Sequence, residues 1–159
     1  AVELRSRARR MKNRNGVGLI VIDYLQLMNY GKFSRDGRQR ETMAISGAIK
    51  AMAKELKVPV IVLSQLSRAT EGRGDNFPKL SDLRDSGAIE QDADIVMLLY
   101  RPSYYQQGDD RNLDNLAILD VAKYRHGSTG RVRMSFQREF TRFEDRNEEE
   151  DEFLSLIHI

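Results

Sequence analysis

The sequence predicts an α/β fold with a mostly parallel sheet and an antiparallel hairpin near its carboxyl end. Two runs of aliphatic residues, at 19–22 and 60–63, lack polar alternation, which is typical of parallel strands buried on both faces. An amphipathic segment at 39–56 connects them, so that strand, helix and strand form a βαβ unit with a right-handed crossover. A third apolar run at 95–100 predicts another buried strand, and the length of 159 residues suits one domain.

Composition excludes several classes of protein. With 40% hydrophobic and 31% charged residues, the chain has the balance of a globular domain. No apolar run approaches the ~20 residues that a membrane-spanning helix needs. The chain has no cysteine, which excludes disulfides and thiolate metal sites. We therefore expect a cytoplasmic protein that does not enter a membrane.

The net charge of +2 conceals a basic beginning and an acidic end. The first fourteen residues predict a basic helix that either contacts phosphate or is a solvated face, with four side chains partly inward: Val2, Leu4, Ala8 and Met11. Residues 144–152 hold seven acids and one arginine, which predicts a disordered tail. The apolar end at 154–159 resembles a read-through or cloning artefact. We thus expect a domain over 1–143 and a tail over 144–159.

The helix at 39–56 carries its apolar residues three or four positions apart, on one stripe: Ile45, Ile49, Met52 and Leu56. This pattern predicts that Met43 and Met52 fill the core and do not act as ligands.

Polar residues end the two predicted parallel strands. Asp23 follows the first run, and Ser64 and Gln65 follow the second, so Asp23 and Gln65 should meet at the sheet edge where ligands bind. Asp23 can hold Mg²⁺ through its water shell beside nucleotide phosphates, and the Gln65 amide can bond a terminal phosphate or the attacking water. Alternatively, Asp23 caps the next turn and Gln65 is only a polar strand end.

Cationic side chains lie in two of the predicted connections. Arg84, close to Gly87, is either a phosphate contact or part of a turn with a surface ion pair. The runs at 116–122 and 132–137 predict an antiparallel hairpin whose tip carries Lys123 and Arg125, two residues apart and suited to reaching phosphate.

Three aromatic or imidazole side chains are interpreted as structural. We interpret Tyr104 and Tyr105 as loop anchors, in preference to platforms on which bases stack. His126 is a turn residue, in preference to a metal ligand, because no second ligand stands at a suitable spacing.

The order of these motifs is more specific than any one of them. The first aliphatic run continues as Asp23-Tyr24-Leu25-Gln26-Leu27-Met28, and the second as Leu63-Ser64-Gln65-Leu66-Ser67-Arg68. Two further stretches are Ser86-Gly87-Ala88-Ile89-Glu90-Gln91-Asp92-Ala93-Asp94 and Lys123-Tyr124-Arg125-His126-Gly127. Across roughly residues 1–143, the chain resembles the carboxyl-terminal part of the DnaB-type replicative DNA helicases.

The resemblance implies part of a RecA-like P-loop NTPase core that uses ATP and Mg²⁺. It implies a homo-hexameric ring that moves along single-stranded DNA and unwinds the duplex at the replication fork, with a helicase loader and primase as partners. Asp23 matches the Walker B carboxylate, and Gln65 the phosphate sensor. The DNA-contacting loop of the family matches Arg84, Asp85 and Gly87. The finger that reaches the nucleotide of the neighbouring subunit matches Lys123 and Arg125.

One departure from the family's pattern affects the expected activity. The chain contains no G-x-x-x-x-G-K-[ST] sequence, and in the family this P-loop and the water-activating glutamate lie upstream of the Walker B strand. We therefore expect a fragment that does not hydrolyse ATP by itself. Two other functions stay open: another RecA-like ATPase of the recombinase type, and a non-catalytic DNA-binding or ring-interaction module.

Overall fold

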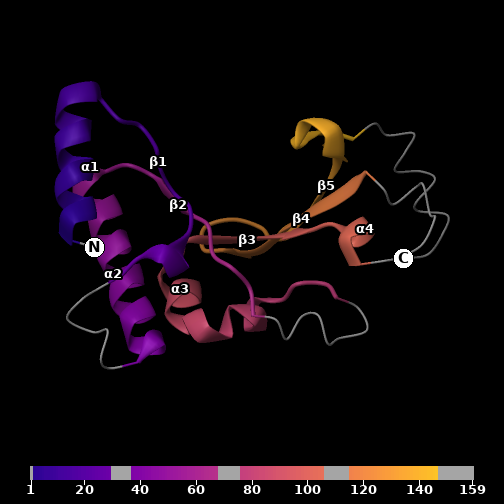
Figure 1. Cartoon of the computed structure of the whole chain (residues 1–159), viewed down its shortest axis with the longest axis horizontal. Coiled ribbons are helices and arrows are strands. Elements are labelled where there is room, and N and C mark those ends of the chain that lie inside the picture. Colours follow the sequence, from indigo (N-terminus) through magenta and orange to yellow (C-terminus); the bar gives the residue numbers. More distant parts are fainter. Residues whose placement is uncertain (1, 30–36, 68–75, 106–114, 147–159) are drawn as a thin grey trace. The chain divides into compact units, whose positions relative to one another are not determined.

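A computed structural model of the chain describes residues 2–29, 37–67, 76–105 and 115–146. The chain separates into two compact units, each described by itself (Figure 1). Unit 1 comprises Ala1–Gly72 and Leu80–Ala93, and unit 2 comprises Arg73–Lys79 and Asp94–Ile159. Among the described residues, no helix is both long enough and apolar enough to cross a membrane.

Unit 1 contains the predicted βαβ arrangement. Its elements are α1 (Val2–Asn15), β1 (Ile20–Ile22), η1 (Leu25–Leu27), α2 (Arg38–Leu56), β2 (Val60–Val62), η3 (Leu80–Ser86) and α3 (Gly87–Asp92). Strands β1 and β2 pair in parallel, with Ile20 opposite Val60. Because α2 lies between these strands in the sequence, the predicted strand–helix–strand unit is confirmed.

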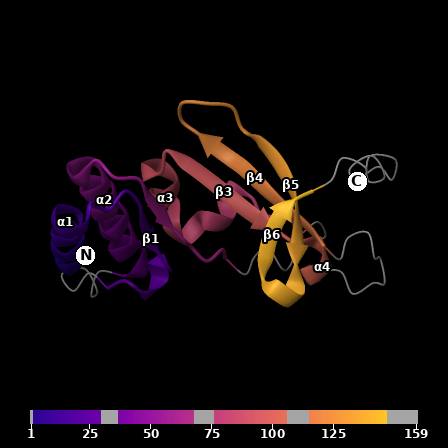
Figure 2. The ribbon, with the colours of Figure 1, turned by 90° about the horizontal axis from the view of Figure 1, so that it is seen from above.

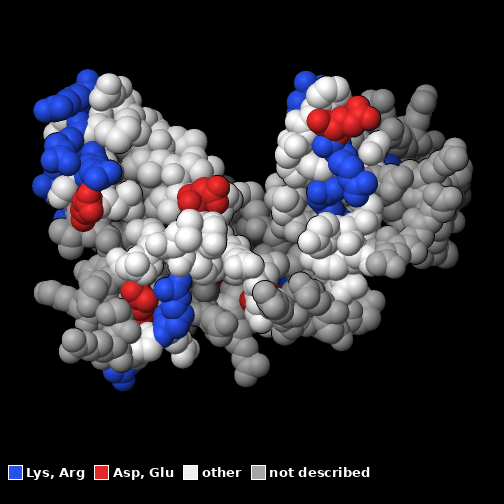
Figure 3. Space-filling model, in the orientation of Figure 1, with Lys and Arg blue, Asp and Glu red and all other residues white. Residues whose placement is uncertain are grey.

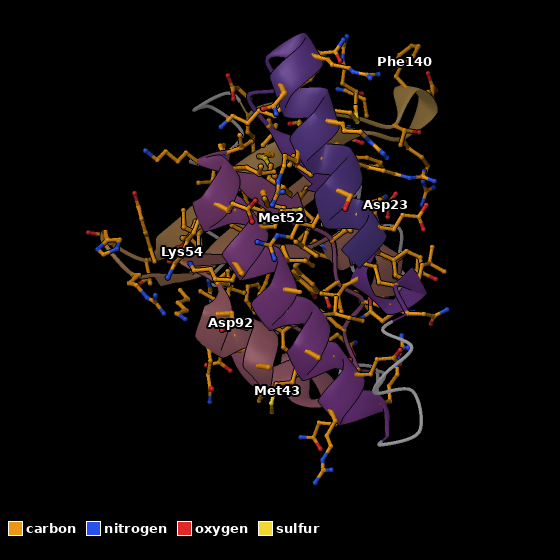
Figure 4. The ribbon with its side chains drawn as sticks, turned by 90° about the vertical axis from the view of Figure 1, so that its left-hand side faces the viewer. Asp23, Met43, Met52, Lys54, Asp92 and Phe140 are labelled. Carbon is orange, nitrogen blue, oxygen red and sulfur yellow. The ribbon has the colours of Figure 1, made fainter. Side chains whose placement is uncertain are left out.

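The apolar stripe of α2 forms the core of unit 1. Its four predicted residues are buried, and Met52 is 1% exposed where it packs with Ala8 of α1. Met43, in contrast, is 55% exposed, so its predicted place in the core is wrong. Met43 precedes Ile45 by two residues, and at about 100° per residue this separation turns its side chain to the opposite face. Figure 4 shows Met43 near one end of α2 and Met52 beside α1.

Helix α1 contacts α2 through both apolar and charged side chains. Leu4 and Ala8 lie inward as predicted, whereas Met11 is 56% exposed. Arg9 and Arg5 both pair with Glu55 of α2, and these hydrogen bonds, the one from Arg9 foremost, lower the pKa of Glu55. Lys and Arg side chains gather over α1 (Figure 3), and two of them are thus used in helix packing.

Among the described residues, the helices of unit 1 cover one face of the parallel strands. Ile20 and Ile22 of β1, with Val60 and Val62 of β2, pack against the helical core. Successive strand residues point to opposite faces. Exposure on the other face reaches 58% for Val21. The prediction of strands buried on both faces is therefore wrong within the described part of the chain.

Unit 2 is built on an antiparallel sheet. Its elements are β3 (Ile95–Tyr100), α4 (Pro102–Tyr105), β4 (Leu116–Tyr124), β5 (Gly130–Gln137), η4 (Arg138–Phe140) and β6 (Arg142–Asp145). The strand order is β3-β4-β5-β6, with every neighbouring pair antiparallel (Figure 2). The predicted hairpin of β4 and β5 is therefore confirmed.

Two strands of unit 2 differ from the sequence-based expectation. β3 pairs antiparallel with β4, and its residues alternate between exposed and buried, so the described strands do not form a mostly parallel sheet. β6 was not expected, and it pairs with β5 up to Asp145, two residues beyond the domain end expected at 143. The predicted artefact at 154–159 and most of the predicted acidic tail lie outside the described residues.

Candidate nucleotide-binding site

Asp23 and Gln65 lie at one edge of the β1–β2 sheet. They line an open hollow of about 350 Å³ together with Tyr24, Leu63 and Ser64. Asp23 immediately follows β1, and Gln65 lies three residues beyond the end of β2. Both side chains are exposed, and Asp23 is labelled in Figure 4. The prediction that these two polar strand ends meet is confirmed, whereas their chemical roles stay predictions.

Main-chain hydrogen bonds hold the two strand ends together beyond the sheet itself. The Leu63 N–H donates to the Ile22 carbonyl, and the Leu25 N–H donates to the Leu63 carbonyl, both at 2.9 Å. The side chain of Leu25 is 2% exposed and packs in the core, and it thereby anchors η1 close to Asp23 in the sequence. The main chain beside the hollow is therefore fixed by hydrogen bonding and by burial.

Sequence reasoning missed Gln26 as a member of this site. Its amide nitrogen donates to Ser64 Oγ at 3.1 Å and to the Gln65 carbonyl at 3.2 Å. Its amide oxygen accepts the Gln65 N–H at 3.2 Å. The available signal was weak: Gln26 is the polar residue within the apolar stretch 25–28, directly after the strand that ends on Asp23.

The side chains at the hollow fit a hydrated magnesium ion. No group of three or more His, Cys, Asp or Glu side chains with metal-site geometry occurs among the residues that the structure describes. Mg²⁺ at a nucleotide commonly keeps several waters and uses one or two carboxylates plus phosphate oxygens, so a dedicated protein cage is not required. The exposed Asp23 carboxylate matches the protein's share of that donor set.

Lys123 and Arg125 belong to unit 2. Lys123 lies in β4, and Arg125 and His126 form the turn after it, as predicted for His126. The Arg125 N–H donates to the Asp94 carbonyl at 2.8 Å, and the Arg125 guanidinium lies 3.4 Å from the Asp94 carboxylate. The side chains of Arg125 and Asp94 are each about half exposed. The hairpin tip therefore presents Arg125 beside an acidic neighbour of its own chain.

The expected DNA-contacting residues are described only in part. Arg84 and Asp85 lie in η3, but their side chains are outside the described residues, and Gly87 begins α3 with open space around it. Their role therefore stays a prediction.

The two tyrosines of α4 have different surroundings. Tyr105 stacks on Tyr100 with ring centroids 5.7 Å apart, which supports its interpretation as an anchor. Tyr104 contacts the edge of Tyr105 and is 74% exposed.

Two parallel strands joined by a helix, with an open hollow at their carboxyl ends, place unit 1 among the α/β folds, in which ligands bind at that edge of the sheet. Within that class, a family model described as DnaB-like helicase C terminal domain matches residues 1–145. The chain belongs to this family.

Individual relatives agree with the family match. The chain is 49% identical over 141 residues to the replicative DNA helicase DnaB of Geobacillus stearothermophilus, which covers 89% of this chain and 31% of the relative. Two solved structures superpose with a TM-score of 0.82, each over 91% of this chain. The first, an ATPase domain, is 42% identical and covered over 50% of its length. The second, a DnaB-like replicative helicase studied with primase, is 41% identical and covered over 34%.

The chain spans about a third of the length of the curated relatives that it matches.

Proposed function

We propose that this chain forms part of the ATPase domain of a replicative DNA helicase. The complete protein moves along single-stranded DNA as a homo-hexameric ring and unwinds duplex DNA at the replication fork, in the cytoplasm. The main support is the 49% identity across 89% of the chain to a replicative helicase. The meeting of Asp23 and Gln65 at one sheet edge agrees with this proposal, because phosphoryl transfer needs metal and phosphate contacts at one place.

Four predicted site residues have defined roles in this proposal. Asp23 holds the Mg²⁺ of bound ATP through water, and Gln65 responds to the terminal phosphate. The ion supplies positive charge that neutralises the phosphate oxygens. Lys123 and Arg125 contact the nucleotide of the neighbouring subunit, where a guanidinium can offset charge on the transferring phosphoryl group.

Two protein partners complete the proposal. Primase is the first, since a solved relative with a TM-score of 0.82 is described together with its interactions with primase. A helicase loader is the second, because a closed ring cannot enclose a DNA strand that has no free end without an opening step.

The complete protein that contains this chain tests the proposal directly. Single-stranded DNA should stimulate its ATP hydrolysis, and a forked duplex should be unwound when ATP and Mg²⁺ are both present. DNA pairing or strand exchange without unwinding would favour a recombinase-type ATPase. Binding of DNA with no hydrolysis under any condition would favour a non-catalytic module.

Arg84 provides a separate test of DNA contact. In the complete protein, Arg84→Ala should weaken binding to all single-stranded sequences alike and reduce the slope of log affinity against log salt by roughly 0.7, because one phosphate contact is lost. Arg40→Ala, which removes an exposed arginine of α2, is the matched control and should leave the slope unchanged. An unchanged slope for Arg84→Ala, with the ring still assembled, would leave Arg84 as a turn or ion-pair residue.

A further inference from the structure

The side chain of Gln26 continues the hydrogen bonding of the sheet where the main-chain ladder stops. The last main-chain bonds join Leu63 to Ile22 and to Leu25, at 2.9 Å each. Two residues farther along the chain, the main chain of Gln65 bonds to a side chain instead. The Gln26 amide donates to the Gln65 carbonyl and accepts the Gln65 N–H, both at 3.2 Å. Gln26 therefore acts as a substitute peptide group for Gln65.

Gln26 is itself fixed from the opposite side. Its main-chain carbonyl accepts a hydrogen bond from Arg38 at the start of α2. Arg38 in turn pairs with Glu41 at 3.2 Å, and the Glu41 side chain is only 7% exposed. Next to Gln26, Leu25 is buried in the core. The position of the Gln26 amide is thus set by α2 and by the core, and it transmits that position to Gln65.

The side chain of Gln65 depends on this arrangement more than a buried side chain would. It is exposed where it lines the hollow, so packing does not hold it in one place. Its direction follows from its main chain, and the main chain is held by Gln26. A glutamine is needed at position 26 because asparagine is one methylene shorter and leucine can neither donate nor accept a hydrogen bond.

We infer that Gln26 is a positioning residue, which holds Gln65 where it contacts the terminal phosphate of ATP. Through the Gln26 hydrogen bonds, the chain that follows β1 is linked to that contact. The inference rests on the proposed function, in which Gln65 responds to that phosphate. Nucleotide binding by the other groups does not require the Gln26 contact. Loss of the Gln26 contact should therefore slow the chemical step, reduce the stimulation of hydrolysis by DNA, and leave the apparent affinity for ATP unchanged.

The complete hexameric protein, with purified ATP, Mg²⁺ and single-stranded DNA, tests this inference. Gln26→Leu should lower kcat by about 10- to 100-fold, as expected for a misplaced group near the reacting atoms, with KM for ATP unchanged. Gln39→Leu, at an exposed glutamine of α2, is the matched control and should keep wild-type kinetics. The double variant Gln26→Leu/Gln65→Ala should be no slower than Gln65→Ala alone, because Gln26 acts through Gln65.

Ring assembly and thermal unfolding are measured for each variant, which separates loss of positioning from loss of folding. If the Gln26→Leu protein does not assemble into rings, the Gln26→Glu variant is measured instead. Glutamate keeps the length and the acceptor for the Gln65 N–H but, when ionised, removes both donated bonds, so kcat should fall by less than in Gln65→Ala.

Three results would overturn the inference, and they distinguish the positioning role of Gln26 from the sensor role of Gln65. Wild-type kcat for both Gln26 variants beside a slow Gln65→Ala variant, or full multiplication of the two losses in the double variant, would refute the positioning role alone. Wild-type kcat for Gln65→Ala would refute the sensor role on which the inference rests, and the positioning role with it.

Discussion

Purified residues 1–159 are expected to show no ATP hydrolysis above background, with or without single-stranded DNA. The polypeptide contains no P-loop sequence, so it lacks the main-chain cradle and lysine that hold the β- and γ-phosphates in related ATPases. Phosphoryl transfer depends almost entirely on positioning and charge neutralisation, and positioning can contribute ~7–11 kcal/mol. Asp23 and Gln65 alone do not supply that positioning.

This expectation is measured as phosphate release over a range of ATP and Mg²⁺ concentrations. Far-UV circular dichroism of the same sample establishes that the helices and strands are formed, so that absence of turnover is not caused by unfolding. The complete protein serves as the active control. DNA-stimulated, Mg²⁺-dependent turnover by residues 1–159, abolished by Asp23→Ala, would show that the phosphate cradle lies within this chain.

The βαβ unit and the meeting of Asp23 with Gln65 were predictable because they depend on local patterns. An aliphatic run that ends on a polar residue marks both a strand and its carboxyl end. A helix between two such strands makes them parallel, which brings their carboxyl ends to one edge. The runs at 116–122 and 132–137, separated by the glycine-containing connection at 123–130, indicated the hairpin in the same way.

Features set by tertiary structure were not predictable from these patterns. An apolar run does not specify the direction of its partner strand, so the pattern at 95–100 predicted a buried strand without indicating that β3 pairs antiparallel with β4. The acidic residues of β6 concealed a strand that pairs with β5. Gln26 bonds to a main chain 39 residues away, and no local periodicity indicates such a contact.

Arg125 carries the second large expected effect. In the complete protein, Arg125→Ala should lower kcat by ~10³–10⁵, the range seen when an arginine finger supplied by a neighbouring subunit is lost. The contact with Asp94 is compatible with this role, since both side chains are about half exposed and surface ion pairs contribute only a fraction of a kcal/mol. Asp94 can therefore hold Arg125 near the hairpin tip without preventing its transfer to a phosphate. Arg133→Ala, on β5, is the control for removal of a cation from the same sheet.

Mixed rings distinguish a finger that acts between subunits from one that acts within its own chain. Arg125→Ala and Asp23→Ala should each be nearly inactive alone, because every site then lacks one required group. In rings assembled from both variants, a site regains both groups wherever the nucleotide of an Arg125→Ala chain faces an Asp23→Ala neighbour. Hydrolysis should therefore partly return. A finger acting within one chain leaves no intact site in any mixture, so absence of recovery in single-turnover measurements, with subunit exchange followed by labelled chains, would contradict the proposed contact between subunits.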